Sequence, residues 1–187
     1  MKSDLGSVLP DYALEDSCHF RIKINKLYWI DKSENNREDL CLHGDLEILL
    51  KNQIFQYSPT VSAAGLKLLR SLMDNHLGGI GDHLFPCCGN TLIGNESLDK
   101  VDIIGCDQGL DWSVSHKDGL VTIKTDEQLE FTIGYLQYKN EISNFAKAIE
   151  YFYKNALERI LPEDIMDREG YLAFWNEWEG LKKKAAL

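Results

Sequence analysis

Alternating hydrophobic and polar residues near the start of the chain predict two β-strands. Phe20, Ile22 and Ile24 alternate with polar side chains within residues 18–30, which is the period of a strand buried on one face. The same alternation returns in residues 40–50, after a polar loop. We expect these two strands to pair antiparallel.

A second group of strands is predicted further along, where short apolar runs are separated by turn residues. Asp118-Gly119 predicts a hairpin turn in this region, because the dipeptide accepts positive φ. The segments that read as strands are residues 101–104, 110–116, 120–125 and 129–136. We therefore expect an antiparallel meander of three or four strands at about residues 101–136.

Three segments show the spacing of three and four residues that is typical of an amphipathic helix. They are residues 60–77, 138–158 and 167–183. We expect Thr60 or Ser62 to cap the start of the first helix and Gly78-Gly79 to end it. Asp167 is expected to cap the third helix.

These elements together predict an α+β fold in which an antiparallel sheet packs against two to three helices. A chain of 187 residues fits one domain, so we expect residues 1–187 to form a single domain, with residues 1–17 as a loosely attached N-terminal segment. Hydrophobic residues make up 44% of the chain and charged residues 27%, which is typical of an ordinary globular protein. Such a chain requires no disulfide, metal or cofactor to fold, and none is expected.

The formal net charge of −10 narrows the choice of partners. It opposes binding to nucleic acid phosphates or to an anionic membrane surface, and it favours a basic protein partner. No apolar run approaches the roughly 20 residues of a membrane helix, and no signal-peptide core follows Met1. The five cysteines are an odd number, so we expect reduced thiols and a soluble protein of the cytoplasm.

Residues 83–116 concentrate cysteine, glycine and aspartate in one stretch. His83, Cys87, Cys88 and Cys106 supply the ligand types that zinc prefers, so a metal-binding module or a cysteine-centred enzyme is one hypothesis. Adjacent cysteines in an extended chain point to opposite faces, however, and the neighbouring aspartates oppose thiolate formation. We favour the alternative that these cysteines are unligated residues that pack as small hydrophobes.

The pattern Gly-Cys-x-x-Gly-x-Asp-Trp in this stretch is expected to shape the scaffold. Asp107 and Asp111 could form an acid–base pair or a site for a hard cation, but two carboxylates are few for either purpose. We favour Asp111 as an acceptor for backbone N–H groups in a turn, with Gly105 and Gly109 supplying positive φ. The expected structural centre consists of Gly89, Gly105, Cys106, Gly109, Asp111 and Trp112.

The C-terminal helix carries the residues that we expect to contact a partner. Its aromatic rings either close the core or grip another protein. Residues 158–179 hold seven acidic side chains against two arginines, which disfavours the stacking of nucleic acid bases on these rings. The candidate partner-binding residues are Asp167, Glu169, Tyr171, Trp175 and Trp178.

Several motifs that define well-known enzymes are absent from the sequence. The chain contains no glycine-rich dinucleotide motif, no Walker-type loop, no His-Glu-x-x-His and no Gly-x-Ser-x-Gly. Because each of these motifs is required by its own mechanism, we expect a non-enzymatic binding protein. A structural subunit of an oligomer is a further hypothesis.

Four groups of residues form a recognisable pattern: Thr60-Val-Ser-Ala-Ala64 leading to Leu-Leu-Arg-Ser-Leu72, Cys87-Cys-Gly89, Gly105-Cys106 with Gly109-Leu-Asp-Trp112, and Asp167-Arg-Glu-Gly-Tyr171 with Phe174-Trp175 and Trp178. This pattern resembles that of a family of small, uncharacterised bacterial cytoplasmic proteins. The resemblance covers most of residues 40–180. Where that family has Cys-Pro-Asn-Gly, this chain has Cys106-Asp-Gln-Gly109, which keeps the glycine but changes the two side chains before it.

Small acidic α+β proteins of this kind are similar in general character, though not in motif, to the immunity proteins that neutralise bacterial toxins. The resemblance implies that an acidic surface occupies the basic cleft of a toxin. We therefore expect a soluble bacterial protein that binds a protein partner, with an immunity protein as one candidate.

Overall fold

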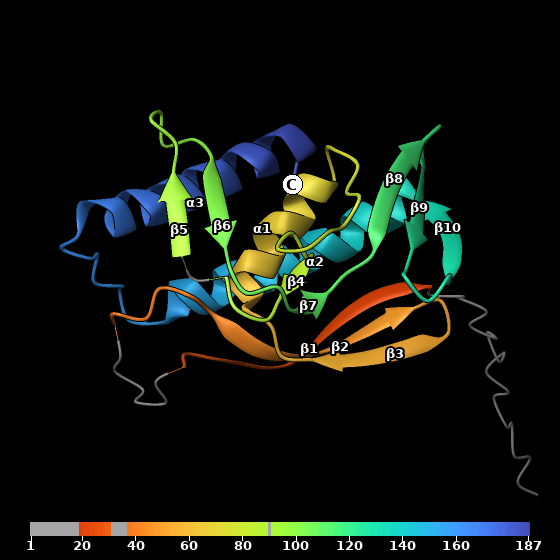
Figure 1. Cartoon of the computed structure of the whole chain (residues 1–187), viewed down its shortest axis with the longest axis horizontal. Helices are drawn as coiled ribbons and strands as arrows, with labels where there is room; N and C mark the ends of the chain where they lie inside the picture. Colours follow the sequence, from red (N-terminus) through yellow and green to blue (C-terminus); the bar gives the residue numbers. More distant parts are fainter. Residues whose placement is uncertain (1–18, 31–36, 90) are drawn as a thin grey trace, which may run out of the picture.

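The computed structural model describes residues 19–30, 37–89 and 91–187. It contains three α-helices and several antiparallel β-sheets within that part of the chain, which confirms the predicted α+β fold. Figure 1 shows the helices stacked above one sheet, with a second sheet standing at one end. The predicted N-terminal segment, residues 1–17, lies outside the described residues. None of the described helices combines the length and the apolar character that crossing a membrane requires.

The first sheet contains the predicted antiparallel pair and one further strand. Its strands, in spatial order, are β1 (Phe20–Tyr28), β2 (His43–Leu50) and β3 (Gln53–Tyr57). Phe20 pairs with Leu50, and Ile22 with Ile48, so these four apolar side chains share the buried face. The N–H of Ile22 donates to the carboxylate of Glu141 at 2.7 Å, so a helix side chain satisfies part of the open edge of β1.

The predicted meander is present, but it is shorter than expected. It consists of β8 (Ser113–Lys117), β9 (Leu120–Lys124) and β10 (Glu130–Gly134). The turn between β8 and β9 places Asp118 at φ 51° and Gly119 at φ 76°, as the Asp-Gly dipeptide predicts.

Four short strands lie outside both sheets and form two separate ladders. They are β4 (Phe85–Pro86) paired with β7 (Gly109–Leu110), and β5 (Thr91–Gly94) paired with β6 (Val101–Ile104). The segment at residues 101–104 is therefore a strand, as predicted, but it does not belong to the meander. The strand expected at residues 110–116 is interrupted at Asp111-Trp112, where the indole turns into the core at 2% exposure.

Helix α1 (Val61–Ser71) is the centre of the molecule, and all but one of its residues are buried. Figure 1 shows it between the first sheet and α3. The helix ends at Ser71, earlier than predicted, and the positive-φ residues Gly78 and Gly79 belong to the loop that follows. Thr60 occupies the N-cap position without a side-chain hydrogen bond, and the Ser62 hydroxyl instead accepts the N–H of Leu42 at 3.2 Å.

Helices α2 (Tyr135–Asn155) and α3 (Ile165–Ala185) follow the meander. Both helices begin earlier than the sequence predicted. The N-cap of α3 is Asp164 and not Asp167, because its carboxylate accepts the N–H groups of Met166 at 2.9 Å and Asp167 at 3.1 Å. The predicted basic end is present, since Lys182, Lys183 and Lys184 lie in the last turn.

Candidate functional site

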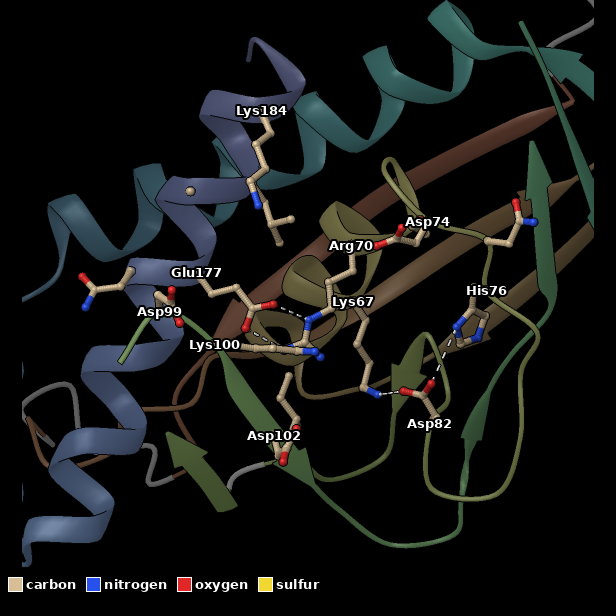
Figure 2. A pocket seen from close by; sticks show the side chains of 16 residues that line it. Lys67, Arg70, Asp74, His76, Asp82, Asp99, Lys100, Asp102, Glu177 and Lys184 are labelled. Carbon is tan, nitrogen blue, oxygen red and sulfur yellow. Dashed lines mark hydrogen bonds and ion pairs between the residues drawn. The ribbon is translucent and has the colours of Figure 1, made fainter. Parts of the chain in front are cut away.

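A cleft of about 950 Å³ opens between α1, the C-terminal half of α3, β6 and the loop that follows α1. Its lining is dominated by charged side chains, several of which point toward one another across the opening (Figure 2). The helices contribute Lys67, Arg70 and Glu177, and the loop contributes His76 and Asp82. This cleft joins elements that are far apart in the sequence.

A buried ion pair forms one wall of the cleft. Arg70 donates to both carboxylate oxygens of Glu177, at 2.7 and 2.8 Å, as the dashed lines in Figure 2 indicate. The same carboxylate accepts the N–H of Val101 at 2.8 Å, and the guanidinium donates to the Val101 carbonyl. Because Glu177 is only 8% exposed, this cluster joins α1, α3 and β6 in a water-poor environment.

A second charged cluster attaches the loop to α1. The ammonium of Lys67 is buried and forms an ion pair with Asp82, whose other oxygen lies 3.9 Å from Nδ1 of His76. The Nε2 of His76 lies 2.9 Å from Asp111, and Asp111 also accepts the N–H of Leu84 at 3.0 Å. Asp111 thus accepts a backbone N–H group, but from a distant segment and not within a turn as predicted, and it also contacts an imidazole.

The ion pair between Lys67 and Asp82 should make the free energy of unfolding depend on pH. Partial burial would raise the pKa of Asp82, but the hydrogen bond and charge of Lys67 outweigh it and hold this pKa below its ordinary value of 3.8. The stabilisation is therefore complete above that value and is lost as pH falls through the lowered pKa. We expect Asp82→Asn to reduce the free energy of unfolding by about 1 kcal/mol at pH 6, since the pair is partly exposed.

Urea denaturation of both proteins at pH 6 and pH 3 checks this expectation. The difference between wild type and variant should be smaller at pH 3 than at pH 6, because pH 3 lies below the ordinary pKa of 3.8 and part of the stabilisation is lost there. An equal difference at the two pH values would contradict a role for the charge of Asp82.

The three central cysteines lie close together, away from the charged cleft. The N–H of Cys106 donates to the sulfur of Cys88 at 3.1 Å. The hydrogen bond with the Cys88 thiol lowers the pKa of Cys106, whereas partial desolvation and a hydrogen bond with Cys106 raise the pKa of Cys87. Within the described part of the chain, no three histidine, cysteine or acidic side chains are placed to hold a metal ion. The Nδ1 atom of His83 is buried without a hydrogen-bond partner.

The glycines of the predicted structural centre serve close packing and not positive φ. Neither Gly105 nor Gly109 has positive φ, so that expectation was wrong. A Cβ at Gly105 would overlap the carbonyl of Cys88, and one at Gly109 would lie 2.5 Å from Cβ of His83. A Cβ at Gly89 would lie 3.1 Å from the side chain of Ala63. These residues let the chain segments around the cysteines touch.

Trp112 completes the centre as a core residue. Its ring packs against Phe20 and Phe85, with centroids 6.2 and 5.2 Å apart. Its Nε1 atom is buried and has no hydrogen-bond partner. The tryptophan therefore joins the first sheet to β4.

The predicted partner-binding residues of α3 divide between the surface and the core. Asp167 and Glu169 are exposed and Trp175 is half-buried, but Tyr171 and Trp178 are buried. Trp178 packs on Phe174 and donates its indole N–H to Glu150 at 2.6 Å. The helix thus uses most of its rings to close the core, and only part of the predicted set is accessible to a partner.

A shallow groove of about 450 Å³ lies beside the accessible part of α3. Tyr153 at the end of α2 lines it, together with Leu157 and Leu161 from the connection to α3 and Tyr171 and Trp175 from α3. The charged residues of its lining are Lys154, Glu158 and Arg159. The rings of Tyr153 and Trp175 meet edge to face, with centroids 4.8 Å apart. The groove is therefore mostly apolar and has a firmly packed floor.

The residues that form the charged cleft, including the buried Lys67 and Glu177, were not predicted from the sequence. One signal was present: α1 is apolar on nearly every side, and Lys67 and Arg70 are its two charged residues, three positions apart. A polar pair on a fully buried helix predicts buried partners elsewhere. Nothing in the sequence pattern identifies Glu177 as that partner.

No family model, curated protein or solved structure matches this chain.

Proposed function

We propose that this chain is a non-enzymatic protein-binding protein that recognises a basic partner through the connection between α2 and α3. The observation that carries the proposal is a run of apolar side chains that stay 42–65% exposed there, interleaved with five acidic residues and two arginines, Arg159 and Arg168. We call these residues the acidic partner surface: Leu157, Glu158, Ile160, Leu161, Glu163, Ile165, Met166, Asp167 and Glu169. Exposed apolar residues surrounded by polar ones are typical of protein interaction sites.

The acidic partner surface offers both contact types that a protein interface uses. The groove beside it, lined by Leu157, Leu161 and Trp175, can receive an apolar anchor. The exposed carboxylates of Glu158 and Glu163 favour a cationic partner and accelerate its approach. In Figure 1 this surface lies at the left edge, where α2 ends and α3 begins.

A basic bacterial toxin is the partner class that fits this surface best. A nuclease toxin carries a basic cleft for its substrate, and an acidic protein that occupies the cleft blocks access. The net charge of −10 supports the same choice. In this proposal the chain acts as an immunity protein by binding and performs no chemical step.

Binding of a defined cationic probe tests the recognition chemistry. The probe is an amphipathic helical peptide of about 20 residues with leucine on one face and lysine on the other, and its control carries glutamate in place of lysine. We expect the lysine peptide to bind, with affinity falling as salt rises from about 50 to 300 mM. Charge reversal by Glu158→Lys with Glu163→Lys should weaken binding at least about tenfold.

A matched double variant separates local recognition from net charge. Asp126→Lys with Glu127→Lys changes the net charge equally at two exposed positions in the turn between β9 and β10, at the end of the molecule opposite the acidic partner surface in Figure 1. This variant should bind the lysine peptide within about threefold of wild type at low salt. Equal weakening by both double variants, or equal binding of both peptides, would overturn the proposed surface.

Coexpression tests the immunity function itself. If a toxin reading frame lies beside the gene for this chain, its product should be tolerated by cells only when the chain is present. Glu158→Lys with Glu163→Lys should reduce that protection, and the matched variant should retain it. Full protection by the charge-reversed variant would contradict a toxin-binding role for this surface.

A further inference from the structure

The cysteines that follow β4 and β6 are brought together by a direct contact between two backbone segments. Gly105 touches the carbonyl of Cys88 so closely that any Cβ there would overlap it. The Cys87 N–H donates to the Gln108 carbonyl at 3.0 Å, and the Cys106 N–H donates to the Cys88 sulfur at 3.1 Å. Disulfide formation requires this kind of proximity between two backbones.

The same cysteines are accessible from solvent. Cys87 is exposed, and Cys88 and Cys106 are partly exposed, whereas Cys41 is buried in the core. All four thiols are free. An oxidant dissolved in water can therefore reach the cluster without unfolding of the chain.

We propose that Cys88 and Cys106 are a reversible redox pair, in which Cys106 reacts with a peroxide and Cys88 then closes an intramolecular disulfide. This modification site is independent of the proposed partner binding, because it lies on different elements and its chemistry needs no partner. The disulfide would join the segment after β4 covalently to the segment after β6.

Hydrogen peroxide is the oxidant, and one molecule of it oxidises the two thiols. The Cys106 thiolate attacks one peroxide oxygen, so an S–O bond forms, the O–O bond breaks, and the departing hydroxide takes up the proton lost by the thiol. The Cys88 thiolate then attacks the sulfenic sulfur, so the S–S bond forms and the S–O bond breaks, with the hydroxide leaving as water. The two thiols lose two electrons, and the peroxide is reduced to two waters.

The surroundings of the thiols favour Cys106 as the group that reacts first. The hydrogen bond with the Cys88 thiol lowers the pKa of Cys106, which increases its thiolate fraction near neutral pH. Partial desolvation and a hydrogen bond with Cys106 raise the pKa of Cys87, although it is exposed, and burial raises the pKa of Cys41 to about 12. Cys41 therefore serves as an unreactive control within the same chain.

Peptide mapping of the full chain after treatment with hydrogen peroxide tests the proposal. A Cys18→Ser background removes the cysteine that lies outside the described residues. We expect a Cys88–Cys106 disulfide that a dithiol reductant reverses, and alkylation of Cys106 at least about tenfold faster than that of Cys41 in the reduced protein. Fragmentation between the two adjacent cysteines identifies which of them has reacted.

Three serine variants distinguish the roles. Cys87→Ser should form the disulfide as the parent does, Cys106→Ser should form none, and Cys88→Ser should leave a sulfenic acid on Cys106 that dimedone traps. A Cys87–Cys106 disulfide in the parent or in Cys88→Ser would overturn the assigned pairing. Disulfides only between two chains, or no thiol loss at all, would overturn the proposed site.

Discussion

Replacing Glu177 by alanine is expected to destabilise the fold by about 3–5 kcal/mol, because it leaves a largely buried charge without its counter-ion and a buried N–H group without an acceptor. Glu177 binds Arg70 through both of its oxygens and also accepts the N–H of Val101. The Arg70 side chain is only 27% exposed, so water can compensate for part of the loss at most. Urea denaturation followed by far-UV circular dichroism measures the change in the free energy of unfolding.

Glu179→Ala is the matched control on the same helix. Its side chain is 54% exposed and meets Lys182 at 3.4 Å, so its removal should cost less than about 0.5 kcal/mol. A second variant, Arg70→Met with Glu177→Leu, removes both charges at once. It should recover part of the loss but not all of it, because both backbone groups of Val101 then lack partners. Equal losses for Glu177→Ala and Glu179→Ala would show that the buried pair contributes nothing specific.

The elements with strong periodicity were predictable from the sequence alone. The apolar spacing along α2 places Tyr138, Ile142, Phe145 and Ile149 on one side, and all four are buried. The same reasoning gave the pairing of β1 with β2. These patterns are reliable because one buried face imposes its period on the residues along each element.

Short and half-exposed strands were not predictable to the same degree. β3 was missed because all of its residues are exposed or half-buried at the edge of a sheet, so the sequence shows little alternation. The strand β6 was predicted but was assigned to the meander, because its actual partner β5 was not predicted. Strand pairing depends on contacts between elements, which a single element's pattern does not contain.

The charged cleft depends on contacts that no local pattern records. Arg70 and Glu177 are 107 residues apart in the chain, and each lies among apolar neighbours whose burial was predicted.

The interruption of the predicted strand at Asp111 has a similar cause. The Asp111 carboxylate contacts Nε2 of His76 and accepts the N–H of Leu84, and both residues belong to the segment between α1 and β4. These contacts orient Asp111 away from the direction of the predicted strand. Tertiary hydrogen bonds thus override local strand propensity at this position.

Two glycines of α3 are expected to respond to alanine with opposite signs. A Cβ at Gly170 would overlap the backbone carbonyl of Leu92 in β5, whereas a Cβ at Gly180 would meet no atom within 4 Å. We expect Gly170→Ala to destabilise the protein by about 3 kcal/mol or more, because neither backbone can turn away from the overlap. Gly180→Ala should stabilise it by about 0.5–1 kcal/mol, since alanine loses less backbone entropy than glycine when a helix forms.

Thermal unfolding of the two variants separates helix propensity from packing. Both replacements raise the helix propensity of α3 equally, so any difference in sign reports the contact with β5. For a chain of this length, the loss at Gly170 corresponds to a decrease in Tm of roughly 6–12 °C, against an increase of a few degrees at Gly180. Stabilisation by both variants would mean that α3 does not touch β5 at Gly170. In that case, the position of the β5–β6 ladder against α3, and with it the wall of the charged cleft formed by β6, would have to be revised.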